Sequence, residues 1–548
     1  MTDRVRTYDT DVLIIGGGLA GCWTAISARR AGVRAIVAEK GYCGTSGVAA
    51  SAGPGHWFVP PEARLREEAI ARRMAGAQGL GDARWMERII DRTYRTLPDI
   101  GTHYHYTPDD SGAVRRHALR GPEYLRALRE KALAAGAVLL DHSPALQLLG
   151  HRDGRVSGAQ GVSRQGDGDE WLVRAGAVVL ATGGCAFRSH LLGGSNNTGD
   201  GLLMAVEAGA ALSGMEFSSF FTVAPANTPL SRAMIFSFAR YYDTQGREIA
   251  KPAAPNDHSA IAVALQGGPV LCDLSATPEI VRRQLPQISP NVTLTFRRLG
   301  IDPFTQRFPI SLLGEGTIRG VGGVRVTGED AGTDVPGLYV AGDVASREPV
   351  TGPVTGGGAV NAAWALASGC IAAEAAARSA LENPLDQRSI LEPLGDAGLS
   401  TRRDRTNSST TRSAFANTLS KGPTRPDASA SSEVEIVLRE EMLSPTRQYF
   451  RNADTLAAAS ARLSAAWGAL RDATPPSAGP RERQRFRELA AMTATARWCT
   501  ASAAARTESL GMHRRTDSST NGSDVPAYVI SGGADTVWTR RQAAGTVS

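Results

Sequence analysis

The sequence contains no uninterrupted run of 18 apolar residues and no pair of cysteines at C-x-x-C spacing. The first absence predicts that no segment crosses a membrane. The second gives no support to a disulfide framework, a zinc site or a protein-bound iron–sulfur cluster, and we predict no metal site. Met1 to Thr10 is charged and leads directly into a predicted strand, so we expect no signal peptide and a cytoplasmic protein.

Lysine is also scarce, because only four of the 60 basic residues are lysines and the rest are arginines. The net charge is +6, but the arginines are spread along the chain, so we expect compositional bias and no nucleic-acid partner. A hydrophobic fraction of 42% is ordinary for a globular protein. The 548 residues exceed one compact core, and two or three domains are expected.

The chain opens with a βαβ pattern. Asp11 to Ile15 predicts a buried strand, a glycine turn and an alanine-rich helix follow, and Arg34 to Ala38 predicts the second strand. Apolar segments at 173–182 and 337–341 predict further strands of the same sheet, and a long helix is expected over 358–381.

Composition then divides the chain into parts. The pattern changes at Met215, where aromatic residues and short mixed segments replace the clean alternation, and it returns after Ile318. We therefore predict a domain at 215–318 inserted between the two halves, 1–214 and 319–383, of an α/β domain. Beyond it we predict a mobile linker at 384–432, a helical domain at 433–517 and an irregular tail at 518–548.

Gly16 to Gly21 fits G-x-G-x-x-G, directly after a predicted strand and at the start of a helix. Gly16 would allow the tight turn, Gly18 the approach of a pyrophosphate, and Gly21 close packing of helix on strand. The helix N-terminus adds N–H donors and positive potential. Glu39 ends the second strand, where its carboxylate can accept both hydroxyls of an adenosine ribose and would repel a 2′-phosphate. The glycines alone could be a structural turn, but with Glu39 they predict a dinucleotide site.

Two later segments favour FAD over NAD. Val178 to Gly184 is a strand ending in A-T-G-G, and Thr333 to Asp343 fits Thr, four residues, then h-Y-h-h-G-D. In that pattern the closing acid hydrogen-bonds the ribityl chain, at the strand end where open α/β sheets bind ligands. No second G-x-G-x-x-G follows a strand, so a separate NAD(P)H domain is not expected.

With these motifs the chain resembles the flavoprotein-subunit family of fumarate reductase, succinate dehydrogenase and L-aspartate oxidase. The blocks that carry the likeness are Glu39-Lys40, Ser46 to Gly53, Ala181 to Gly184, Thr198 to Gly201, Met215 to Phe217, Gly337 to Asp343 and Arg506 to Arg514. They cover about 8–381 and 433–517. The resemblance implies an α/β fold: a Rossmann-type FAD-binding domain with an inserted α+β capping domain and a C-terminal helical domain.

The resemblance also implies which residues contact FAD. They are Gly16, Gly18, Leu19, Ala20, Gly21, Glu39, Lys40, Thr45, Ser46, Gly53, Ala145, Ala181, Thr182, Gly183, Asp200, Gly342, Asp343, Gly358, Ala359 and Val360. The helix beginning near Gly358 is expected to direct its N-terminus at the pyrimidine end of the flavin, where its dipole would stabilise negative charge.

The chain departs from the family at the covalent tether and at the dicarboxylate ligands. Ser46 stands where succinate dehydrogenases have the histidine that carries FAD, so the FAD is expected to be non-covalent. The family's carboxylate ligands and its proton-shuttling arginine are replaced by Phe221, Ile318, Val350, Val354 and Asn256. Each lost ionic contact to a buried carboxylate costs on the order of 2–5 kcal/mol, so succinate, fumarate and aspartate are not expected as substrates.

Aromatic residues gather in the predicted insertion instead. Either they line a site for an apolar or aromatic substrate, or they form the core of the capping domain; they are Phe217, Phe220, Phe221, Phe236 and Phe238.

The candidate catalytic residues lie close to these motifs. Arg319 follows a lost ligand and would re-create a cationic anchor, with a surface ion pair as the alternative. His56 follows the flavin-contacting loop, Tyr241 would be a phenol donor, and Arg347 would contact substrate or form a structural pair with Glu348. Further candidates are Arg240, Tyr242 and His258, whereas His513 is expected to dock domains.

These features predict an FAD-dependent dehydrogenase, desaturase or oxidase that transfers a hydride between FAD and a small, non-dicarboxylate substrate. One alternative is a relative of the adenylylsulfate reductase flavoprotein subunit, which would need a second chain. Another is a non-catalytic flavin-bearing subunit that passes electrons. The electron acceptor would be oxygen, a quinone or a redox partner protein.

Overall fold

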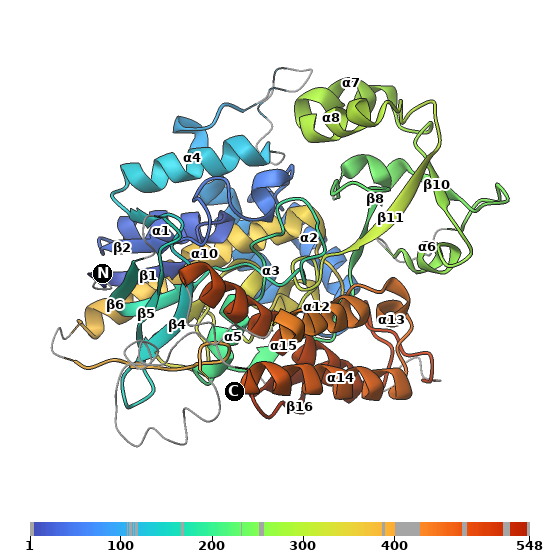
Figure 1. Cartoon of the computed structure of the whole chain (residues 1–548). Helices are drawn as coiled ribbons and strands as arrows, with labels where there is room; N and C mark the ends of the chain where they lie inside the picture. Colours follow the sequence, from blue (N-terminus) through green and yellow to red (C-terminus); the bar gives the residue numbers. More distant parts are fainter. Residues whose placement is uncertain are drawn as a thin grey trace.

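The structure is a computed structural model that describes residues 5–106, 108, 112, 114, 119–165, 169–231, 233–250, 257–385, 389–400, 428–473, 479–518 and 526–544. Figure 1 shows a sheet flanked by helices at one end of the molecule, an insertion at the opposite end, and a layer of C-terminal helices beneath both. The α/β fold class predicted from the sequence is confirmed. The predicted domain boundaries remain predictions.

The main sheet has eight strands in the order β14-β4-β5-β6-β1-β2-β3, with β13 also paired to β6. Its strands are β1 (Arg6–Ile15), β2 (Ala35–Ala38), β3 (Val138–Leu140), β4 (Ala145–Gly150), β5 (Val156–Val162), β6 (Glu170–Leu180), β13 (Leu338–Val340) and β14 (Glu392–Pro393). The strands β3, β2, β1, β6 and β13 are parallel, and Ile15 is in register with both Ala38 and Leu180. Their carboxyl ends therefore meet at one edge of the sheet.

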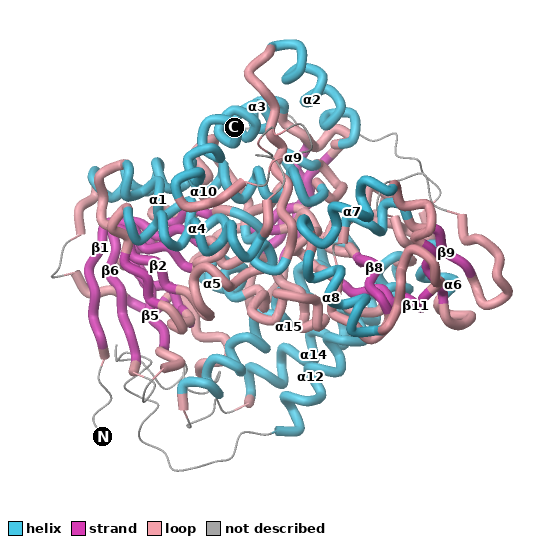
Figure 2. The backbone as a smooth tube through the Cα atoms, turned by 90° about the horizontal axis from the view of Figure 1, so that it is seen from above, coloured by secondary structure: helices cyan, strands magenta, loops and turns pink. Residues whose placement is uncertain are grey.

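Helices of the same part of the chain lie against this sheet or pack on one another. They are α1 (Leu19–Arg30), α2 (Ala63–Gly76), α3 (Ala83–Thr96), α4 (Gly121–Ala134), α5 (Asp200–Glu207), α9 (Glu348–Thr351) and α10 (Gly357–Glu382), with 3-10 turns η1 (Val48–Ser51), η2 (Leu97–Thr102) and η4 (Gly342–Val344). Seen from above in Figure 2, α1 and α10 run along the strands. α10 is the one described helix long and apolar enough to cross a membrane, but 83% of its most apolar window is buried inside the protein. We identify it as a core helix.

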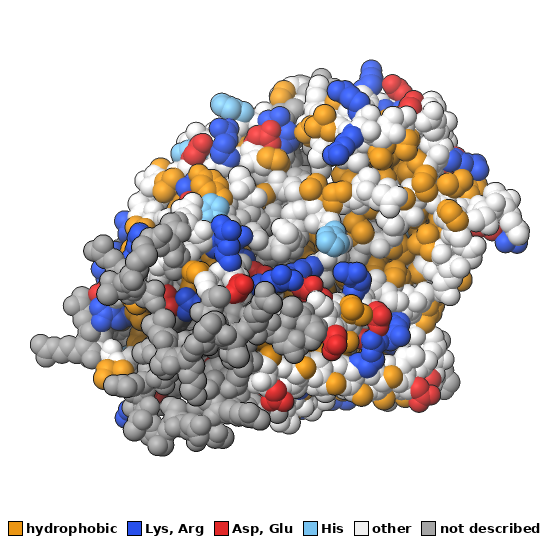
Figure 3. Space-filling view, in the orientation of Figure 1, with side chains coloured by type: hydrophobic (Ala, Val, Ile, Leu, Met, Phe, Trp, Pro, Cys, Tyr) orange, Lys and Arg blue, Asp and Glu red, His pale blue; other side chains and the backbone are white. Residues whose placement is uncertain are grey.

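The insertion forms its own small sheet, in the order β8-β11-β10-β9, with its own buried cluster. Its elements are β8 (Phe221–Pro225), η3 (Met234–Phe238), β9 (Arg240–Tyr242), α6 (Ser259–Ala264), β10 (Val270–Asp273), α7 (Glu279–Ile288), α8 (Pro290–Leu299) and β11 (Phe308–Gly314). Apolar side chains also reach the surface here, among them Met234, Val263 and Leu294. Figure 3 shows hydrophobic side chains gathered over this part of the molecule.

The C-terminal part contains α12 (Ala428–Met442), α13 (Pro445–Tyr449), α14 (Ala453–Asp472) and α15 (Pro480–Ala505). The prediction of an irregular tail was wrong, because β15 (Ala527–Gly532) and β16 (Trp538–Ala543) form a hairpin. The hairpin completes a third sheet with β7 (Leu212–Ser213) and β12 (Gly323–Val324). Most of the predicted linker, 401–427, lies outside the described residues, but β14 within it pairs with β4.

A buried polar cluster joins the C-terminal part to the rest. Glu216 is fully buried and pairs with Arg506 at 2.8 Å, while Arg451 donates to the Glu216 carbonyl and to Nδ1 of His513. Because an arginine only donates, Nδ1 of His513 accepts, and Nε2 donates to the Arg506 carbonyl at 3.0 Å. Burial, together with the positive charge of Arg451, lowers the pKa of His513. The geometry supports the predicted docking role of His513.

Candidate functional site

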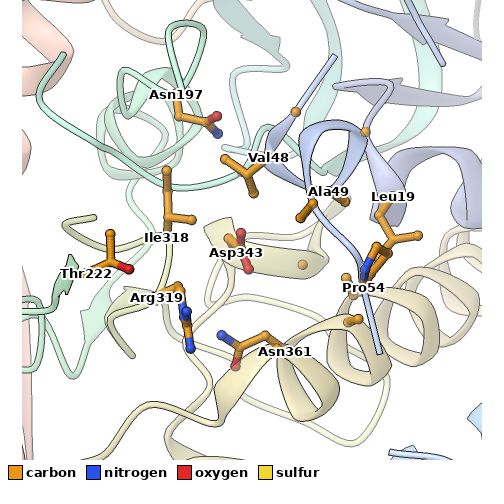
Figure 4. A pocket seen from close by; sticks show the side chains of 18 of the residues that line it. Leu19, Val48, Ala49, Pro54, Asn197, Thr222, Ile318, Arg319, Asp343 and Asn361 are labelled. Atoms are coloured by element: carbon orange, nitrogen blue, oxygen red, sulfur yellow. The ribbon is translucent and has the colours of Figure 1, made fainter. Parts of the chain in front are cut away.

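A cavity of about 900 Å³ opens at the edge where the parallel strands end. That volume lies at the upper end of the range for ligand pockets. Nearly all the residues predicted to contact FAD line it; those that do not are Gly21, Thr45 and Val360. The cavity continues into the insertion, and Figure 4 shows Leu19, Asp343 and Thr222 around it although they come from distant parts of the sequence.

The glycines of the turn have two roles, because some allow α1 to pack and one leaves space at the cavity wall. Gly16 has φ +106°, and a Cβ on Gly21 would stand 1.8 Å from the Gly16 carbonyl oxygen, so helix α1 could not pack there with a larger residue. Gly18 also lines the cavity, but a Cβ there would meet no protein atom within 4 Å. Gly18 therefore leaves room for a ligand at the N-terminus of α1, where N–H groups favour a pyrophosphate.

Glu39 is buried at the end of β2 with its carboxylate held by two backbone N–H groups. Gly17 N–H donates to Oε2 at 2.5 Å and Gly41 N–H donates to Oε1 at 2.6 Å. This arrangement keeps the carboxylate at the cavity wall. Its remaining lone pairs suit the two hydroxyls of a ribose.

Lys40, beside Glu39, belongs to a network that reaches the C-terminal helices. Its ammonium lies 2.6 Å from Asp200 and 2.8 Å from Glu488 of α15, and it donates to Thr198 at 2.7 Å. Burial alone would raise the pKa of Glu488, but Lys40 and Arg188 lower it to about 2. The network holds Lys40 and Asp200 in place without leaving a net positive charge in the cavity.

Arg347 was predicted as a possible substrate contact, and its position differs from that prediction. Its side chain is 1% exposed, does not line the cavity, and forms an ion pair with Asp343 of η4. It also donates to the carbonyls of Ile318 at 2.8 Å and Thr317 at 3.2 Å. Every one of these contacts faces the protein, so Arg347 orients Asp343 at the cavity wall.

His56 lines the cavity and is 4% exposed. The Trp23 indole N–H donates to the Tyr124 hydroxyl at 2.9 Å, and that hydroxyl lies 3.3 Å from Nε2 of His56. Because an indole only donates, the hydroxyl hydrogen is available for Nε2, and Nδ1 then carries the imidazole hydrogen. Nδ1 is buried with no protein partner, and burial lowers the pKa of His56 to about 3. His56 is therefore a neutral donor and not a general base.

The part of the cavity within the insertion carries a different set of groups. The Arg319 guanidinium stacks on Phe220, 4.7 Å from the ring centroid, and its Nε is buried without a hydrogen-bond partner. Tyr241 of β9 also lines the wall, and burial raises the pKa of its phenol well above the usual range. His258 lines it too, with Nδ1 2.9 Å from the Phe221 carbonyl. The other candidates, Arg240 and Tyr242, do not line the cavity.

The positions of the family's carboxylate ligands are apolar in space as well as in sequence. Ile318 lines the cavity at 2% exposure, whereas Phe221 packs against Tyr449 and Val350 is fully buried. Neither Val350 nor Val354 lines the cavity, and Asn256 lies outside the described residues.

The aromatic residues of the insertion divide between the two predicted roles. Phe220 and Phe236 line the cavity, while Phe217 and Phe221 belong to buried clusters. Phe238 does neither.

Sequence reasoning missed two asparagines. Asn197 and Asn361 line the cavity, and the side-chain oxygen of each is buried without a partner. Asn197 directly precedes the Thr198–Gly201 block, which could have drawn attention to it, but no local signal marks Asn361 on α10. Together with Nδ1 of His56, these unpartnered atoms fit a ligand with donors and acceptors along its length, as FAD has.

Comparison with known proteins gives the same picture. The FAD binding domain family matches residues 11–100 and 93–360, and the fumarate reductase flavoprotein C-terminal family matches 440–544. An L-aspartate oxidase of Streptomyces coelicolor is 31% identical over 61% of this chain and 63% of its own length. One of the subunits of a fumarate reductase (CoM/CoB) of Methanothermobacter marburgensis is 26% identical over 93% of this chain and 94% of its own length.

Among solved structures, the flavoprotein of an E. coli quinol fumarate reductase has a TM-score of 0.77 at 19% identity, covering 98% of this chain and 97% of the other. That likeness shows the shared fold. The two matching families span most of the described chain and agree with the cavity, its glycine turn and its closing acid. The chain thus belongs to the FAD-dependent flavoprotein family of fumarate reductase, succinate dehydrogenase and L-aspartate oxidase.

Proposed function

We propose that this oxidoreductase transfers a hydride between non-covalently bound FAD and a small substrate that is not a dicarboxylate. The observation that carries the proposal is the wall of the cavity within the insertion. Among its described residues it presents one arginine, Arg319, without an acidic partner, and apolar groups such as Ile318 where the family has charged ones. A second carboxylate would have no cation to pair with, which costs on the order of 2–5 kcal/mol.

FAD, when bound, supplies a two-electron acceptor and donor at its ring system. The protein would hold the cofactor through Glu39, Gly18, Asp343 and the N-terminus of α10, all of which line the cavity. The α10 N-terminus favours negative charge near it. Ser46 offers no imidazole for a covalent link, which supports dissociable FAD.

We assign proton transfer to His258. A carbonyl only accepts, so the 2.9 Å contact with the Phe221 carbonyl places the hydrogen on Nδ1, and Nε2 is then the proton-accepting nitrogen of the neutral ring. Tyr241 is a poorer base at neutral pH because burial raises its pKa. An imidazole can pass the proton to solvent between turnovers. The electron acceptor would be oxygen, a quinone or a redox protein.

An anaerobic reduction screen tests the proposal. The purified protein should be yellow, denaturation should release intact FAD, and uncharged or singly charged apolar reductants should bleach the flavin while succinate does not. Flavin that stays attached to the denatured chain contradicts non-covalent binding. Bleaching by millimolar succinate contradicts the substrate class.

A non-catalytic electron-transfer subunit predicts a different result from the same screen. In that case redox proteins or dithionite would reduce the flavin and no small organic molecule would. His258→Gln separates the two cases, since it should lower the rate of reduction by substrate at least 100-fold and leave reduction by dithionite unchanged.

A further inference from the structure

We propose that Arg319 binds the single carboxylate of an otherwise apolar substrate, an aryl- or alkyl-carboxylate. The inference rests on the proposed function, because it places this carboxylate in the part of the cavity within the insertion. Arg319 directly follows Ile318, which stands at the position of a lost family ligand. The unpaired guanidinium and the composition of the wall around it carry the inference.

The other charges on or beside the cavity wall already have partners. Lys40 pairs with Asp200, Asp343 with Arg347, and Asp257 with Arg514. Arg319 makes no ion pair and no hydrogen bond with any described residue. Among the cations of the described wall, Arg319 is therefore the one whose charge a ligand can pair with.

The surroundings of Arg319 fix its orientation. Its guanidinium carbon lies 4.7 Å from the centre of the Phe220 ring, and in Figure 4 the end of the side chain lies beside Asn361. A stacked guanidinium presents a planar fork of N–H donors, which matches the two oxygens of one carboxylate. Because an unpaired charge in a partly dehydrated site is costly, a bound carboxylate would also relieve that cost.

The rest of the wall is suited to a hydrocarbon body. Met234, Phe236, Val223, Ile261 and Ile318 line the same part of the cavity. A phosphate group carries more charge than one arginine neutralises and would lie against these apolar side chains. A monocarboxylate with an aliphatic or aromatic body can pair with Arg319 through its carboxylate and pack its body against the apolar wall.

The test measures binding to the FAD-loaded protein through perturbation of the flavin absorbance. The probes are butyrate, phenylacetate and 2-naphthylacetate, each beside its uncharged amide, together with succinate. The variants are Arg319→Gln and Arg319→Lys, and the control is Arg540→Gln. Arg540 lies 5.9 Å from the Trp538 ring, is exposed and does not line the cavity.

We expect at least one carboxylate to bind ten-fold or more tightly than its amide. Arg319→Gln should weaken that carboxylate by about 30-fold or more and leave the amide unchanged, since it removes one member of a charge pair. Arg319→Lys should recover part of the loss, because it restores the charge but not the fork. Arg540→Gln should change neither ligand, and all variants should keep their FAD content.

Several outcomes would overturn the proposal. They are equal binding of every acid and its amide, an equal loss for both in Arg319→Gln, and the absence of any response across the panel. If uncharged aromatic compounds perturb or reduce the flavin without any preference for carboxylates, the anchor is refuted while the proposed function stands. If succinate alone binds, both are refuted.

Discussion

The two halves of the cavity differ in how their polar groups are satisfied. In the nucleotide half, the Glu39 carboxylate accepts two backbone N–H groups, Lys40 lies between Asp200 and Glu488, and Asp343 pairs with Arg347. In the substrate half, Arg319 lies over the Phe220 ring and forms no ion pair with a described residue. The charged groups of the first half already have partners before a ligand arrives, whereas Arg319 in the second half gains its partner from the ligand.

This difference separates the residues that bind the cofactor from the residue that selects the substrate. A site whose charged groups are already held in place fixes the position of a cofactor that never changes, and this prior ordering strengthens binding. A site with one unsatisfied cation discriminates among substrates, because only a ligand with a matching anion removes the cost of that charge.

The largest effect should come from the glycine turn. Gly21→Ala places a Cβ 1.8 Å from the Gly16 carbonyl oxygen, so it should prevent α1 from packing and leave no folded, FAD-loaded protein. Gly18→Ala is the matched change, because its Cβ meets no protein atom within 4 Å and its φ of −76° suits alanine. It should fold with a thermal midpoint within a few degrees of the parent apoprotein, yet bind FAD at least ten-fold more weakly.

Thermal melts and FAD titrations of the two variants separate folding from binding. A Gly21→Ala protein with normal stability and FAD content would show that the turn tolerates a side chain. A Gly18→Ala protein with normal FAD affinity would show that the pyrophosphate does not approach that residue.

Two arginines give the next comparison. Arg347→Met should lower the free energy of unfolding by about 3–5 kcal/mol, because it removes the ion pair with Asp343 and the hydrogen bonds to the carbonyls of Thr317, Ile318 and Gly320. Arg319→Met should change it by less than about 1 kcal/mol or raise it, since Arg319 gives up no ion pair. Urea unfolding of both apoproteins measures the difference, and equal losses would contradict the distinction between the two halves.

The nucleotide half was also the half that could be predicted from sequence. Gly16, Glu39, Ala181 and Asp343 each follow a strand, and parallel strands necessarily bring their carboxyl ends together. Local pattern and topology therefore specify the same edge. Gly18 and Glu39 lie where the motif implies they should.

The substrate half could be predicted only in part, because it is assembled from η3, β8, β9, α6 and the residues before β12. Arg319 was a candidate from its place beside a lost ligand, but no local pattern shows that Arg347, only 28 positions later, faces the protein instead. The prediction of an irregular tail was wrong for a related reason. β16 is mostly polar, because it is an exposed edge strand. Its pairing with β15 depends on a sheet that distant residues complete.

Glu488 makes the stability of the nucleotide half depend on pH. Its pKa of about 2 in the folded protein lies below the ordinary 4.5, so its contribution to stability is present above pH 4.5 and is lost as the pH falls toward 2. Glu488→Gln should therefore lower the free energy of unfolding by about 2–3 kcal/mol at pH 7, with the deficit shrinking below pH 4.5. A deficit that stays constant down to pH 3 would mean that the carboxylate's charge is not what stabilises the network around Lys40.

Glu348 should behave in the opposite sense. Its carboxyl is 1% exposed beside Ser213, and burial together with the nearby Glu216 raises its pKa to about 8. A folded pKa above the ordinary 4.5 means that the stability it contributes is complete below pH 4.5 and is lost as the pH rises to 8. Glu348→Gln, which resembles the protonated form, should lie within about 1 kcal/mol of the parent near pH 5 and exceed its stability by about 3–5 kcal/mol at pH 8.5. Urea unfolding at the two pH values checks this, with Glu68→Gln as an exposed control that should show no such trend. If Glu348→Gln is destabilising at both pH values, the buried carboxyl is charged in the folded protein and depends on a cationic partner, as Glu488 does.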